Sequence, residues 1–182
     1  MRATAIASLL TVLSATSGLA IECPVDHAIY TQKTKGWVLK ISPVGEDGAA
    51  NQFVALRLEA PGGITPWEGG IYQPNGFGQV MASVDQGCPA DIAEAEDADA
   101  DDQAAIDAAA EDCRGYDGSI YALVGNGIEP FPVDYENRSA PAPQQVLLPD
   151  FAAGVWYSPI RELAFTEMGG PEDIFTLAAC AK

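Results

Sequence analysis

Basic residues are scarce in this sequence, which has 9 Lys and Arg and a single His against 26 Asp and Glu, for a formal net charge of −17. Nucleic-acid interfaces need clustered lysine and arginine, so this balance argues against a nucleic-acid partner. With His27 as the only histidine, neither a zinc site nor an imidazole-activated nucleophile is indicated. Simple solubility is the preferred explanation of the acidic surplus, which would also favour a basic partner or a cation.

Long apolar runs and the common catalytic motifs are also missing. No stretch after residue 20 reaches the roughly 20 apolar residues of a membrane-spanning helix, so no membrane span is expected. The GxGxxG, P-loop, HExxH and GxSxG patterns do not occur, and no catalytic residue is assigned. Hydrophobic residues nevertheless make up 48% of the chain, which is enough for a core and excludes global disorder.

Residues 1–20 have the pattern of a secretory signal peptide. Arg2 precedes an uncharged apolar stretch, and the small residues Gly18 and Ala20 occupy the positions that a signal peptidase requires. Cys23 does not follow Ala20 directly, so a lipid anchor is not expected. Cleavage would leave 8 basic residues against 26 acidic ones, a net charge of −18. The sequence therefore predicts a periplasmic or secreted protein, with a bacterial periplasm as the preferred compartment.

The four cysteines predict two disulfides, because an even number of cysteines in an exported chain is typical of a disulfide framework. Four cysteines allow three pairings, and we favour Cys23–Cys180, which would join the two ends of the mature chain, and Cys88–Cys113. The chain-entropy model assigns about 5 kcal/mol to the longer loop and about 3.5 kcal/mol to the shorter one.

Short β-prone segments separated by glycine and proline turns run through residues 21–182, which we expect to form one domain. We expect a mainly β fold, a small antiparallel barrel or sandwich, with one short helix near the C-terminus that Asp150 would cap. Residues 54–59 alternate between apolar and polar side chains, the period of a half-buried strand. The expected strands are 27–32, 36–42, 52–59, 69–72, 77–84, 118–124, 144–148 and 173–180, with 129–133 at most an edge strand.

An acidic, alanine-rich insertion at 89–112 interrupts this pattern. From Asp91 to Asp112 it contains ten acidic residues, nine alanines and no basic residue. We expect a solvated loop with a helical second half, since alanine favours helix while clustered carboxylates repel one another.

Within the insertion, Asp97, Asp99 and Asp101 match positions 1, 3 and 5 of an EF-hand calcium loop. The sixth position, which needs glycine, is Asp102, and the twelfth, which needs glutamate, is Ala108. The sequence thus predicts no cofactor and no tight calcium site, and leaves loose binding of a divalent cation or docking of a basic partner as alternatives.

Trp67 lies among glycines, with Gly69 and Gly70 just after it, and this pattern predicts a loop that exposes an aromatic side chain for binding. The favoured function is an exported, non-enzymatic binding or accessory protein of the bacterial cell envelope, whose partner is a protein or a small ligand. The two alternatives are an envelope hydrolase with a carboxylate-based site and an acidic inhibitor of a basic enzyme such as lysozyme.

Overall fold

The structure, a computed structural model, describes residues 21–46, 48–74, 78–86, 115–137, 140–158, 160–165 and 169–182. The expected signal peptide, the acidic insertion at 89–112 and the cysteines Cys88 and Cys113 lie outside these ranges, as do Asp97, Asp99 and Asp101.

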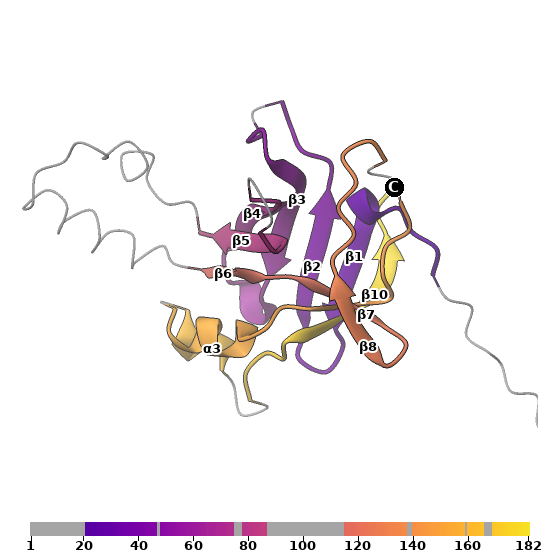
Figure 1. The fold of residues 1–182 in the computed structure, drawn as a ribbon. Helices are drawn as coiled ribbons and strands as arrows, with labels where there is room; N and C mark the ends of the chain where they lie inside the picture. Colours follow the sequence, from indigo (N-terminus) through magenta and orange to yellow (C-terminus); the bar gives the residue numbers. More distant parts are fainter. Residues whose placement is uncertain are drawn as a thin grey trace, which may run out of the picture.

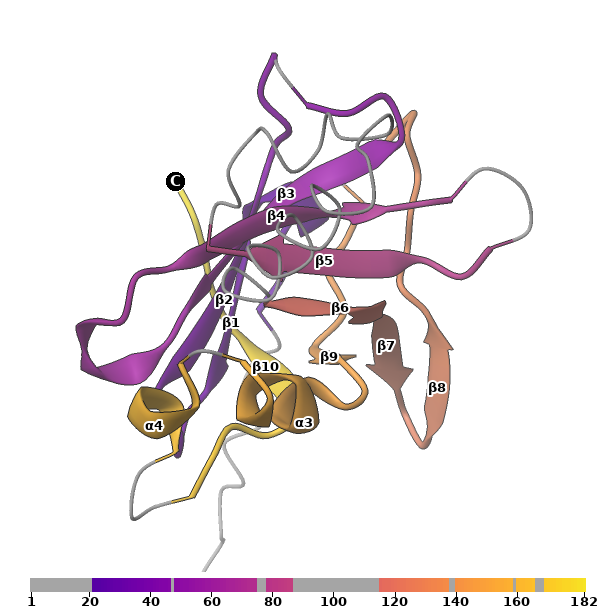
Figure 2. The same cartoon turned by 90° about the vertical axis from the view of Figure 1, so that its left-hand side faces the viewer.

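A ten-stranded antiparallel sheet dominates the described residues, in the order β6-β5-β4-β3-β2-β1-β10-β9-β7-β8. The sheet is strongly curled into a half-barrel around one core (Figure 1 and Figure 2), so the expected mainly β fold is confirmed. The strands are β1 (Ala28–Gln32), β2 (Trp37–Ser42), β3 (Gln52–Glu59), β4 (Trp67–Tyr72), β5 (Met81–Asp85), β6 (Tyr116–Ser119), β7 (Tyr121–Val124), β8 (Gly127–Pro130), β9 (Gln145–Leu147) and β10 (Ile174–Cys180).

Alternating side chains fill the core. In β2, Trp37, Leu39 and Ile41 are each about 1% exposed, while the residues between them are partly exposed. In β3, Val54, Leu56 and Leu58 are likewise buried, as their alternation with polar residues predicts. One face of the sheet therefore forms the core and the other carries the polar residues.

The expected strand at 118–124 is divided in two by Ile120. Its backbone N–H donates to the Val80 carbonyl at 3.1 Å, on the β5 side, whereas the next residue, Tyr121, pairs with Pro130 and Leu147 at the opposite end of the sheet. The buried side chain of Ile120, 1% exposed, lies at this change of direction. The chain thus links the two ends of the curled sheet without a ladder of hydrogen bonds closing the barrel.

Two short helices follow β9 where one was expected: α3 (Phe151–Trp156) and α4 (Arg161–Ala164). They lie together at one end of the half-barrel, beside β6 and β10 (Figure 2). Phe151 fixes α3, because its fully buried ring makes edge contacts with Trp37, Tyr116 and Phe175 at centroid distances of 5.2, 5.7 and 5.5 Å.

The residue that was expected to cap α3 is not the one that does so. Asp150 precedes α3 but has a left-handed backbone (φ 60°), and its side chain makes no capping bond. Instead Oδ1 of Asp173 accepts the Ala152 amide at 3.0 Å. The capping carboxylate thus comes from the segment before β10, which local sequence does not reveal.

The two ends of the described chain meet at β1 and β10. Cys23 and Cys180 form a disulfide with Cα atoms 5.7 Å apart, the pairing favoured from the sequence. Ala28 pairs with Cys180, and the Ala181 amide donates to the His27 carbonyl at 2.8 Å. No helix within the described ranges combines the length and apolarity that crossing a membrane requires.

Candidate functional site

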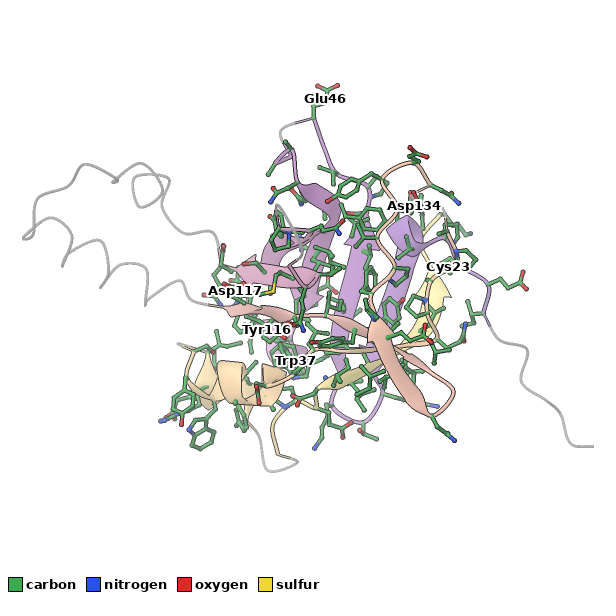
Figure 3. The ribbon with its side chains drawn as sticks, in the orientation of Figure 1. Cys23, Trp37, Glu46, Tyr116, Asp117 and Asp134 are labelled. Atoms are coloured by element: carbon green, nitrogen blue, oxygen red, sulfur yellow. A yellow bond between two sulfur atoms is a disulfide. The ribbon has the colours of Figure 1, made fainter. Side chains whose placement is uncertain are left out.

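A groove of about 820 Å³ lies between α3 and β6, which is the edge strand at one end of the sheet. We call it the β6 groove, and its volume falls within the range of about 300–1,000 Å³ usual for ligand sites. Its lining comes from β5, from residues 115–119 and 121, and from α3 with the two residues before it and Tyr157 after it. Figure 3 shows Tyr116 and Asp117 on β6, above α3.

The pairing of β5 with β6 places polar side chains in this groove. Ser83 lies opposite Asp117 in the register, and both belong to the lining. Because the Ile120 amide bonds toward β5, backbone alternation directs the polar backbone groups of Asp117 and Ser119 to the outer edge of β6. The outer edge of the edge strand β6 therefore carries these backbone groups, of which the Ser119 carbonyl lies within hydrogen-bond distance of the Tyr116 hydroxyl group.

Two glycines of the groove lining permit close packing of β6. A Cβ at Gly115 would collide with the Val84 carbonyl, and one at Gly118 would collide with the hydroxyl group of Tyr116. On α3, a Cβ at Gly154 would lie 3.6 Å from the ring of Tyr116, an ordinary contact distance. The first two glycines are thus required by packing around β5 and Tyr116.

Tyr116 joins the two walls of the groove. Its Oη lies 3.0 Å from the Ser119 carbonyl on β6 and 3.0 Å from the Pro149 carbonyl just before α3, and its proton can be donated to one of them at a time. Burial raises the pKa of Tyr116 well above its usual range, and the negative charges of Asp173, Asp150 and Asp117 raise it further. The phenol therefore stays protonated and donates at neutral pH.

Among the residues that the structure describes, the lining carries acidic charge and aromatic rings and no Lys, Arg or His. The carboxyl groups belong to Asp85, Asp117 and Asp150, and Tyr121 and Tyr157 contribute rings in addition to Tyr116. Carboxylates attract cations, and aromatic faces bind ammonium or guanidinium groups. The chemistry of the β6 groove is therefore suited to a cationic group.

Other polar features of the described residues are less suited to binding. Nδ1 of His27 lies 2.8 Å from the carboxylate of its neighbour Asp26, and His27 lines neither the β6 groove nor the second hollow described next. A second hollow of about 730 Å³ is lined in part by Gln32 and Glu172, whose polar groups are already hydrogen-bonded to each other. Within the described ranges, no group of three or more potential metal ligands comes together.

The prediction that Trp67 lies in an exposed binding loop is wrong. Trp67 begins β4, pairs with Leu58, and is only 1% exposed, with its ring centroid 6.2 Å from that of Trp37. A Cβ at Gly69 would collide with the Ser83 carbonyl, and one at Gly70 would collide with the side chain of Gln52. These glycines thus permit close packing of neighbouring strands, which explains their presence without a loop.

The remaining candidates from the sequence are Cys88, Cys113, Asp97, Asp99 and Asp101, and all of them lie outside the described residues. Sequence reasoning missed the β6 groove. The pair Tyr116–Asp117 stands between Gly115 and Gly118, and this spacing is the only local signal that the segment packs closely.

Comparison with known proteins gave no match: no family model fits the chain, and neither the curated proteins nor the solved structures include a significant relative.

Proposed function

We propose that this chain is an exported binding or accessory protein of the bacterial cell envelope that holds a cationic partner in the β6 groove and does not act as an enzyme. The observation that carries the proposal is the lining of that groove, which among the described residues has three carboxyl groups, three tyrosines and no basic residue. A net charge of −17 adds long-range attraction for a cationic partner. The disulfide between Cys23 and Cys180 supports an oxidising compartment.

A charge-matched comparison tests this proposal. The probe is an octalysine peptide, and its affinity for the full chain is measured by calorimetry at low and moderate salt. The groove variant is Asp117→Asn with Asp150→Asn, and the control is Glu129→Gln with Glu136→Gln, which removes the same charge from exposed positions outside the groove lining. Asparagine tolerates the left-handed backbone at position 150.

We expect the groove variant to bind octalysine about five- to thirtyfold more weakly, since each exposed ion pair contributes about 0.5–1 kcal/mol. The control should retain nearly full affinity. Equal losses in both variants, or no binding by the native protein at low salt, would contradict the proposal. In the specific case of a basic enzyme, the native protein should inhibit lysozyme and the groove variant should not.

The same carboxyl groups support a second candidate, a carboxylate-based envelope hydrolase. Asp117 on β6 and Asp150 just before α3 both belong to the lining of one groove, and hydrolysis by an acid and a base uses a pair of carboxyl groups. Clearing of a peptidoglycan suspension by the native protein, with loss of activity in either Asp117→Asn or Asp150→Asn, would favour this candidate over pure binding.

A further inference from the structure

Two large aromatic side chains are exposed at the end of α3. Trp156 is 45% exposed and Tyr157 80%. We call this surface the α3–α4 face and define it by these two residues together with Arg161 and Phe165, which contact Trp156. Exposed aromatic and apolar groups gathered in this way commonly mark an interaction surface.

Trp156 is already held in place within the α3–α4 face. Its ring makes an edge contact with Phe165 at a centroid distance of 5.0 Å, and the guanidinium carbon of Arg161 lies 5.1 Å from the ring centroid. Arg161 also lies 3.0 Å from the carboxylate of Glu162. A fixed tryptophan loses little conformational entropy when a partner covers it, which favours binding.

The α3–α4 face is continuous with the β6 groove. Tyr157 belongs to both, because it lines the groove and is also the most exposed residue of the face. The carboxyl groups of Asp117 and Asp150 lie on the groove side of this tyrosine. An aromatic centre flanked by charged groups is the usual composition of a protein-binding surface, in which Trp, Tyr and Arg contribute most of the affinity.

We infer that the α3–α4 face docks a folded basic protein, one of whose lysine or arginine side chains enters the β6 groove. This inference rests on the proposed function and names its partner class. The partner's charge follows from complementarity with the acidic groove beside the face. A second copy of this chain would bring like charges together, since each copy carries −17.

Val124 and Ile128 form the comparison surface. They lie on the β7–β8 hairpin and are 49% and 62% exposed, close to the values of the α3–α4 face. Glu129 and Pro130 follow on the same terminal strand, and charge and proline are usual protection of a sheet edge against pairing. Neither Val124 nor Ile128 belongs to the groove lining.

Site-specific photo-cross-linking in the producing cells tests the inference. A benzoylphenylalanine residue replaces Tyr157 in the full exported chain, and in a matched strain it replaces Ile128. We expect a product from position 157 that contains a protein with more Lys and Arg than Asp and Glu, and none from position 128. Adding Trp156→Ser should lower the yield about fivefold or more, whereas adding Val124→Ser should not change it.

Other outcomes would overturn the inference. These are a product between two copies of this chain, a partner that is not basic, a lipid adduct, equal yields at both positions, or no product at position 157. Binding of octalysine by the groove without a product at position 157 would leave the proposed function standing and remove the docking face. A basic partner captured in equal yield after Asp117→Asn with Asp150→Asn would also overturn the inference, because the partner's basic side chain would then not depend on the β6 groove.

Discussion

Replacing Phe151 with alanine is expected to remove a large part of the stability of the domain. The ring is fully buried and lies against aromatic rings of three strands, Trp37 of β2, Tyr116 of β6 and Phe175 of β10. Substitutions of this kind cost about 3–5 kcal/mol, and the cost is highest where the surroundings cannot collapse into the cavity. Because strands on three sides hold the site open, we expect a loss of about 4 kcal/mol.

The loss should be measured by urea unfolding, with tryptophan fluorescence as the signal because Trp37 touches the replaced ring. A domain of this size has a total stability of about 5–15 kcal/mol, so Phe151→Ala should lower the midpoint strongly while the native state stays populated without urea. Phe151→Leu, which keeps more of the volume, should cost about 1–2 kcal/mol.

Leu163→Ala on α4 is the matched control. Leu163 is 64% exposed, and an exposed substitution of this type should change the free energy of unfolding by less than about 0.5 kcal/mol. A loss below about 1.5 kcal/mol for Phe151→Ala, with an unchanged urea dependence, would refute the conclusion that Phe151 anchors α3. The position of α3 as a wall of the β6 groove would then need another explanation.

Three further outcomes follow from the same contacts. Cys23→Ser with Cys180→Ser should lower the free energy of unfolding by up to about 5 kcal/mol in urea titrations, since the bridge closes a loop with a sequence separation of 157, and a change below about 1 kcal/mol would contradict this. Burial raises the pKa of both Tyr30 and Tyr116 in the folded state. Their contribution to stability is therefore complete below about pH 10 and is lost at higher pH. In an alkaline titration, tyrosinate absorbance from these two residues should appear together with unfolding and not before it. Asp173→Ala removes the acceptor at the start of α3 and should cost about 1 kcal/mol by thermal or urea unfolding, and no change would show that this bond is dispensable.

Segments whose side chains alternate strictly were predictable from the sequence alone. The expected 52–59 became β3 (Gln52–Glu59), because one set of alternating residues is apolar and the pattern has only one arrangement that buries it. The pairing of Cys23 with Cys180 was predicted from their positions near the two ends of the expected mature chain, and this disulfide forms. In these cases local pattern and global structure agree.

Glycine patterns were ambiguous, and this explains the error at Trp67. Glycine between an aromatic residue and a strand is compatible with a turn, where it supplies unusual backbone angles, and with a strand, where it permits close approach. Gly69 and Gly70 are of the second kind, because neighbouring strands leave no room for a Cβ at either position. The distinction depends on atoms contributed by Ser83 and Gln52, which are distant in sequence.

The β6 groove depends on the same kind of long-range information. Asp117 and Asp150 are separated by 32 residues, and they share a groove only because the barrel stays open at β6 while Phe151 holds α3 beside that strand. Neither carboxyl group lies in a motif, so no spacing rule could select them from the 26 acidic residues of the chain. What distinguishes them physically is Tyr116, whose buried hydroxyl group spans the same gap and fixes its width. A Tyr116→Phe variant would therefore be expected to weaken octalysine binding although it changes no charge, and the size of that loss would separate the geometry of the groove from its electrostatics.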